Sequence, residues 1–109
     1  MSAITTHVLD TARGRPAAGV SVRLERGGRV LGEGSTDADG RLRTLLPADA
    51  PLEPGVYRLA FDTGAYFRAQ GTESFYPHVS IDFQVRDGGQ HHHVPLLLSP
   101  FGYSTYRGS

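Results

Sequence analysis

Histidine supplies the most informative reactive groups of this sequence, which contains five histidines and no cysteine. Three of them are consecutive, His91 to His93. Successive side chains of a strand point to opposite faces, so we expect His91 and His93 to lie together and His92 to oppose them. Two imidazoles on one face could bind zinc if a neighbouring strand supplied a third ligand. A polar strand end with solvated or carbonyl-bonded imidazoles is the commoner situation, and we predict no metal and no cofactor.

His7 and Arg41 also carry useful chemistry, although each has a simpler explanation when it is considered alone. His7 interrupts the apolar segment "ITTHVLD", where a histidine is usually a satisfied strand residue. Arg41 follows the turn "DADG", where an arginine is usually a solvated charge. Tyr103 and Tyr106 alternate in the last segment, a pattern typical of half-buried strand residues at an oligomer interface. An interface and a binding site are compatible roles for these tyrosines.

Charge and motif content argue against several classes of function. Eleven basic and eleven acidic residues cancel, so the large positive field required for binding nucleic acid or an anionic membrane is missing. Asp37 and Asp39 do not continue into the twelve-residue calcium loop. A phosphate-binding Gly-rich loop and a G-x-S-x-G elbow are absent as well. The absence of cysteine excludes disulfides and thiolate chemistry.

The elements that must position these residues are predicted to be strands. Fourteen glycines and seven prolines mostly separate short apolar runs, as in antiparallel all-β proteins. Residues 78–87 show the clearest alternation, and we expect Gly14, Pro16 and Gly19 to break any ladder after the first strand. Eight segments fit this pattern, namely residues 3–11, 20–25, 30–36, 41–46, 56–62, 78–87, 90–99 and 103–108. Together they predict a two-sheet β-sandwich of seven or eight strands.

One short helix is expected at about residues 63–70. Thr63 is a candidate N-cap and Gly71 a candidate stop signal. With 109 residues, of which 39% are hydrophobic, we expect one domain over residues 1–109. The first ten residues lack the charged and apolar regions of a secretory signal, and we expect a soluble, cytoplasmic protein that binds neither nucleic acid nor membrane.

Three separated blocks of the sequence resemble one known family. They are "THVLDTARGRPAAGVSVRL" (residues 6–24), "DADGRLRTLL" (37–46) and "HHHVPLLLSPFGYSTYRGS" (91–109). This pattern is similar to that of the 5-hydroxyisourate hydrolases, also called transthyretin-related proteins, and the similarity extends over essentially the whole chain. The resemblance implies a transthyretin-like sandwich of two four-stranded sheets. It also implies a homotetramer, built as a dimer of dimers, with small-molecule sites in the channel between the dimers.

The same resemblance implies a set of site residues. The catalytic residues would be His7, Arg41 and His93. The substrate-binding residues would be His7, Arg41, Tyr106, Arg107, Gly108 and Ser109. The family often has tyrosine where this chain has His92, which should face away from the site.

The reaction implied by the resemblance is the hydrolysis of 5-hydroxyisourate to 2-oxo-4-hydroxy-4-carboxy-5-ureidoimidazoline in urate degradation. Histidine suits water activation because its unperturbed pKa lies near 6.5. Arg41 would stabilise the negative charge of the transition state. Either histidine could accept the proton. The alternative is a non-catalytic, transthyretin-like carrier, which would lack the two histidines, the arginine and the closing Tyr-Arg-Gly-Ser.

Overall fold

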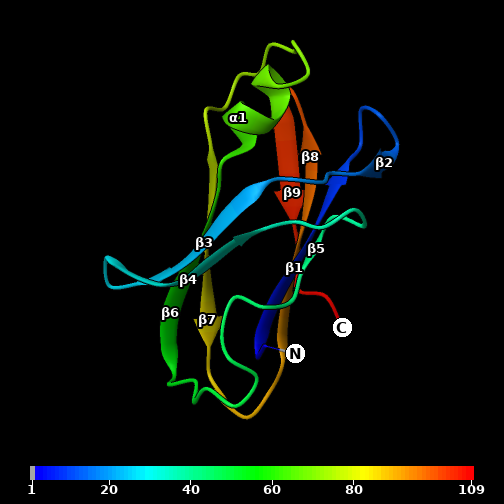
Figure 1. The fold of residues 1–109 in the computed structure, drawn as a ribbon. Coiled ribbons are helices and arrows are strands. Elements are labelled where there is room, and N and C mark those ends of the chain that lie inside the picture. Colours follow the sequence, from blue (N-terminus) through cyan, green and yellow to red (C-terminus); the bar gives the residue numbers. More distant parts are fainter. Residues whose placement is uncertain (1) are drawn as a thin grey trace.

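The computed structural model describes residues 2–109 and consists of two packed β-sheets with a short helix at one end (Figure 1). The first sheet contains β1 (Ile4–Asp10), β2 (Arg15–Pro16), β5 (Arg41–Leu42), β8 (His92–Ser99) and β9 (Gly102–Thr105). The second sheet contains β3 (Ser21–Arg26), β4 (Arg29–Ser35), β6 (Gly55–Phe61) and β7 (Val79–Val85), in the order β4-β3-β6-β7. The predicted two-sheet, all-β sandwich is confirmed.

The core lies between the two sheets and follows from the alternation of each strand. Leu24 in β3, Leu59 in β6 and Leu96 in β8 are completely buried, while alternate residues face outward. Removing such a side chain from water contributes about 1.5–3 kcal/mol. Phe67 of the helix joins the same cluster, so the helix closes one end of the sandwich.

The first sheet brings distant parts of the chain together along β1. One edge of β1 pairs in parallel with β8, which places Thr5 opposite His93. The other edge pairs antiparallel with β5, which places His7 opposite Arg41. The two ends of the sequence and its central turn therefore meet on one strand.

All eight predicted strands are present, together with a ninth that was not expected. The additional strand β2 pairs Pro16 with Leu9, although Pro16 was predicted to break the ladder. Proline is tolerated there because β2 is at the edge of the sheet and needs no further N–H donor. The predicted strand 41–46 shortens to β5, since Leu45 turns into the core. The first sheet therefore has five strands rather than the expected four.

The helix α1 (Thr63–Arg68) lies where it was predicted, but its cap differs. Asp62, not Thr63, is the N-cap, and its carboxylate accepts a hydrogen bond from the backbone N–H of Ala65 at 3.2 Å. Thr63 is instead the first helical residue and is buried. In the described part of the chain, no helix has the length and apolar character needed to cross a membrane.

Candidate active site

A cavity of about 350 Å³ on the first sheet collects most of the site residues predicted from the sequence. It opens on the face of β1 that lies away from the core, because Ile4 and Val8 point inward and His7 alternates with them. The predicted residues that line it are His7, Arg41, His93, Tyr106, Gly108 and Ser109. Thr5, Thr6, Arg43, His91 and Pro95 complete the lining.

His7 is held by the turn that precedes Arg41. Its Nε2 lies 2.9 Å from the carbonyl oxygen of Asp39. A carbonyl oxygen can only accept, so Nε2 carries the proton and the neutral ring keeps its lone pair on Nδ1. His7 is therefore oriented by the backbone of the same turn that delivers Arg41.

Arg41 is positioned by a tight turn whose conformation is specified by two residues. The Asp37 carboxylate accepts hydrogen bonds from the backbone N–H groups of Asp39 and Arg41 at 2.9 and 3.0 Å. Gly40 has φ 76°, a value that favours glycine, and a Cβ there would overlap the carbonyl oxygen of Val8. The "DADG" turn therefore fixes the start of β5 against β1.

His93 occupies the opposite wall and is enclosed on two sides. Its Nδ1 lies 2.8 Å from the hydroxyl of Thr5, and its ring stacks on His91 with the centroids 6.3 Å apart. The backbone N–H of Gly108 donates to the carbonyl of His93 at 2.8 Å. A Cβ at Gly108 would overlap the His93 ring, so only glycine allows this approach. The segment after β9 therefore packs directly on His93.

Both histidines are shifted toward the neutral form. Burial lowers the pKa of His7, and the Arg41 charge lowers it further, while hydrogen bonding to Asp39 opposes these effects. Burial also lowers the pKa of His93, with additional lowering from Arg41, His91 and His7. Neutral imidazoles at neutral pH can accept a proton, as a general base must.

Of the predicted residues in the closing segment, Tyr106 and Ser109 line the cavity, whereas Arg107 points elsewhere. Tyr106 lines the cavity with 58% of its surface exposed, and Ser109 is beside it. Arg107 is not part of the lining. Its guanidinium points to the side chain of Gln90 and the carbonyl of His91, at 3.3 and 3.4 Å.

His91 and His93 share one face, as predicted, whereas His92 is buried on the other. Within residues 2–109, no three His, Cys, Asp or Glu side chains are grouped so that they could hold a metal ion.

The sequence alone did not indicate Thr5 or Arg43 as site residues. Thr5 stands two residues before His7, a spacing that places both on the same face of β1 and could have indicated it.

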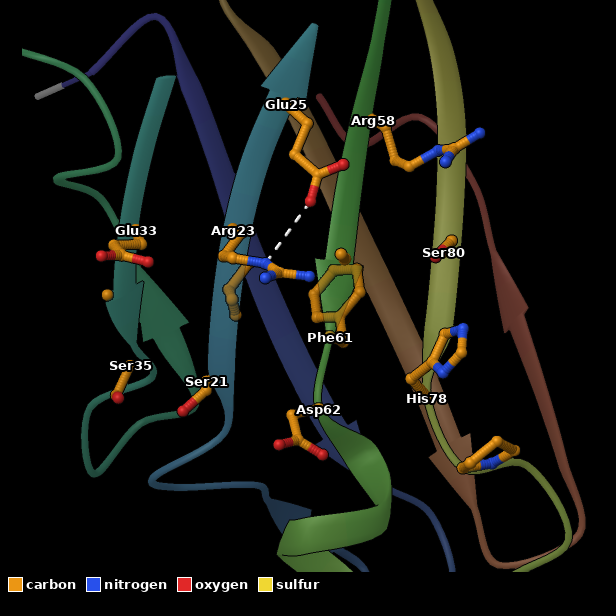
Figure 2. Close-up of a pocket in the computed structure, with 14 residues that line it drawn as sticks. Ser21, Arg23, Glu25, Glu33, Ser35, Arg58, Phe61, Asp62, His78 and Ser80 are labelled. Atoms are coloured by element: carbon orange, nitrogen blue, oxygen red, sulfur yellow. Dashed lines mark ion pairs between the residues drawn. The ribbon is translucent and has the colours of Figure 1, made fainter. Parts of the chain in front are cut away.

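A second hollow, of about 750 Å³, lies on the outer face of the other sheet (Figure 2). Its two arginines are already paired: Arg23 lies 3.4 Å from Glu25 on the same strand, and Arg58 of β6 lies 2.8 Å from Asp82 of β7. His78 is the single histidine in its lining, and Figure 2 shows it away from the Arg23–Glu25 pair. The hollow therefore lacks the two neighbouring imidazoles of the first cavity.

The two-sheet sandwich with its short helix defines a transthyretin-like protein. The chain belongs to the HIUase/Transthyretin family, whose profile matches residues 4–108. It is 52% identical to the 5-hydroxyisourate hydrolase of Caulobacter vibrioides, and the match covers the whole of both chains. It is 47% identical to the 5-hydroxyisourate hydrolase of Mus musculus, covering 99% of this chain and 96% of the relative.

Solved structures show the same relationship. The 5-hydroxyisourate hydrolase of Klebsiella pneumoniae matches with a TM-score of 0.89 and 45% identity, covering 97% of this chain and 98% of that one. Sea bream transthyretin in complex with thyroxine matches with a TM-score of 0.86 and 32% identity, covering 96% of this chain and 93% of that one. The fold is therefore shared by a relative named as a 5-hydroxyisourate hydrolase and by a transthyretin whose structure contains thyroxine.

Proposed function

We propose that this chain hydrolyses 5-hydroxyisourate to 2-oxo-4-hydroxy-4-carboxy-5-ureidoimidazoline in urate degradation. The observation that carries the proposal is the cavity that brings His7, Arg41 and His93 together from three separate strands. Its volume of about 350 Å³ suits a purine-sized heterocycle. The names of the relatives from Caulobacter vibrioides, Mus musculus and Klebsiella pneumoniae support this substrate.

The proposed reaction begins when a neutral histidine accepts a proton from water. The resulting hydroxide attacks a ring carbonyl carbon of the substrate, and the carbonyl π electrons move onto oxygen. Arg41 stabilises this oxyanion, since its guanidinium is permanently charged and presents several donors. Collapse of the intermediate breaks the ring C–N bond, and the imidazolium returns its proton to the departing nitrogen. Tyr106, Gly108 and Ser109 contribute to the wall of the cavity that holds the flat ring.

The proposal is tested by the ultraviolet absorbance of freshly generated 5-hydroxyisourate. Wild-type protein should accelerate its decay, and His7→Ala should reduce the acceleration by roughly 100-fold or more, as expected for a lost acid-base group. His78→Ala is the matched control, because His78 lines the hollow on the outer face of the other sheet. Decay at the spontaneous rate with wild-type protein would contradict the proposal.

The carrier alternative rests on the likeness to sea bream transthyretin, whose structure contains thyroxine. The two histidines and the arginine in the cavity favour an enzyme, because a carrier that only binds its ligand requires no general base. The absorbance assay distinguishes the two functions, since a carrier would bind small molecules without accelerating the decay. Chelator treatment should leave the rate unchanged, because no step in this scheme uses a metal.

We also propose a homotetramer built as a dimer of dimers. Within residues 2–109, β7 pairs with β6 alone and β9 pairs with β8 alone, so both strands have a free edge. Exposed aromatic residues lie beside these edges: Tyr76 packs edge-to-face against Phe75 and Tyr103 at 5.0 and 5.4 Å between ring centroids. Such residues are enriched at protein interfaces.

Light scattering after size exclusion tests the assembly. Wild-type protein should have four times the mass of the chain, and Tyr103→Asp should produce smaller species. Val30→Asp is a suitable control, since Val30 is 52% exposed on a different strand. A wild-type protein that elutes as a monomer at all concentrations would refute the tetramer.

A further inference from the structure

The hydroxyl of Thr5 lies between two imidazoles of the candidate site. Its Oγ1 is 2.8 Å from Nδ1 of His93 and 2.9 Å from Nε2 of His91. Thr5 is buried, with 3% of its surface exposed, and the parallel register of β1 and β8 places it directly opposite His93. Both distances are those of well-formed hydrogen bonds.

One hydroxyl cannot donate a hydrogen bond to two neutral imidazoles at once. It has a single proton to donate, so it can donate to only one of the two ring nitrogens and accepts N–H from the other. The tautomers of the neutral His91 and His93 rings are therefore coupled through Thr5. The backbone of Thr5 raises the pKa of His93, as a carbonyl that faces a ring N–H would.

We propose that Thr5 is a positioning residue for His93: its hydroxyl accepts the Nδ1–H of His93 and donates to Nε2 of His91. This arrangement leaves the lone pair of the neutral His93 ring on Nε2, the nitrogen not bound to β1. The inference rests on the proposed function and deepens it, since it identifies His93 as the base that accepts the water proton. In that step the O–H bond of water breaks, a new N–H bond forms at Nε2 of His93, and Nδ1–H remains bound to Thr5.

The surroundings of His93 agree with this role. Arg41 from β5, His7 from β1 and His91 beside β8 all face the ring, and Arg43 completes the basic lining. These groups disfavour a positive charge on His93 in the resting state, so the ring stays neutral until it takes the proton. His7 is oriented differently, because its Nε2 donates to the carbonyl of Asp39 rather than to a side chain.

The kinetic test uses three variants and the 5-hydroxyisourate decay assay. Thr5→Val removes the hydroxyl at nearly constant volume and should lower kcat about 10- to 100-fold, as is typical of groups that orient a functional histidine, with little change in KM. Thr5→Ser should restore most of the rate. Thr11→Val removes a hydroxyl that bonds the carbonyl of Leu98, far from the cavity, and should leave kcat unchanged. Full activity in Thr5→Val would overturn the positioning role.

A second measurement needs neither turnover nor a variant of Thr5. Nitrogen-15 NMR of the histidine rings at pH 8, above the ordinary histidine pKa of about 6.5, reports which nitrogen carries the proton. Wild-type His93 should be protonated at Nδ1. In His91→Ala, an exposed substitution, the freed hydroxyl should donate to His93 and increase the Nε2–H form. Predominant Nε2–H in the wild-type protein would refute the inference, whereas the expected tautomer without any hydrolysis would refute the proposed function instead.

Discussion

Arg41 acts on both histidines of the cavity through its charge. Its charge lowers the pKa of His7 and of His93, so its removal should raise both. A histidine base works only when it is neutral. The fall of kcat/KM at acidic pH, which is the acid limb of the pH profile, must therefore follow these pKa values. The wild-type acid limb should therefore lie below the ordinary histidine pKa of 6.5.

Arg41→Gln should move this limb to higher pH and reduce the plateau rate by about 100-fold or more, as expected for a lost oxyanion donor. Arg41→Lys keeps the charge but not the planar donor group, so its limb should remain near the wild-type position while the rate falls. The pH profiles of the three proteins provide the test. An unchanged limb in Arg41→Gln would show that Arg41 does not control the histidines.

Gly108 is the second residue whose identity follows from the geometry of the site. A Cβ at this position would overlap the ring of His93, so Gly108→Ala should displace the ring and lower kcat by roughly 10-fold or more, since a 1 Å misplacement of a reacting group can cost 100-fold. Gly102→Ala is the control, because a Cβ at Gly102 meets only Ser99 Oγ at 3.7 Å. Equal activity of the two variants would argue against tight packing of the closing segment on His93.

At the scale of elements, a partly buried hydrogen bond attaches α1 to the first sheet. The hydroxyl of Tyr66 donates to the carboxylate of Asp10 at 2.7 Å, and Asp10 is 1% exposed. Burial and this hydrogen bond raise the pKa of Tyr66, so the hydroxyl remains a donor at neutral pH. The other carboxylate oxygen accepts the backbone N–H of Arg13 at 3.0 Å. The contact therefore links the helix, the end of β1 and the turn that follows it.

Tyr66→Phe should lower the free energy of unfolding by about 1–3 kcal/mol, because a buried carboxylate loses a hydrogen bond. Tyr76→Phe is the control, since the Tyr76 hydroxyl has no hydrogen-bond partner in the described residues. Urea denaturation of the three proteins measures the difference. Equal midpoints for Tyr66→Phe and wild type would show that the contact does not anchor the helix.

Strands could be predicted from the sequence where one face is buried and the other is not. Residues 78–87 alternate in this way, and β7 lies within them. The short strand β2 could not be predicted, because a two-residue edge strand has too few residues to show alternation. The predicted N-cap, Thr63, is one residue after the observed one, Asp62. Both residue types are favourable caps, and the tertiary structure buries Thr63.

The candidate site was predictable only in part from the sequence itself. Alternation placed His91 with His93, but nothing local links His93 to His7, because their proximity arises from the parallel pairing of β1 with β8. The grouping therefore came from resemblance to a family rather than from spacing. Thr5 was missed because a threonine in a strand is common, and its bridging role depends on two imidazoles contributed from 86 and 88 residues away.

At the scale of the whole molecule, stability should depend on the protonation of buried histidines. His92 is 5% exposed, and its Nδ1 has no hydrogen-bond partner in the described structure. Burial lowers its pKa, and the Arg107 charge lowers it further. The unfolded chain then binds more protons than the folded one below the ordinary pKa of 6.5, so stability should be complete at neutral pH and should decrease as the pH falls through this region. The lowered pKa values of His7 and His93 also make stability decrease as the pH falls.

His92→Phe replaces the imidazole with an apolar ring and should weaken this pH dependence while leaving catalysis intact, since residue 92 faces the core. The urea midpoint measured at pH 7.5 and at pH 5 gives the comparison for wild type and variant. His78→Phe, which changes a histidine in the second hollow, is the matched control. Identical pH dependence in His92→Phe and wild type would show that His92 does not control acid stability.

The central claim is that His7 and His93 act as one unit within a single cavity. A double-mutant cycle in kcat/KM for 5-hydroxyisourate tests it most directly, using His7→Ala, His93→Asn and the double variant. Each single substitution should cost roughly 100-fold or more, and the double substitution should cost far less than the product of the two losses, because groups that act together are not additive. Losses that multiply, or near-normal rates in either single variant, would contradict the account.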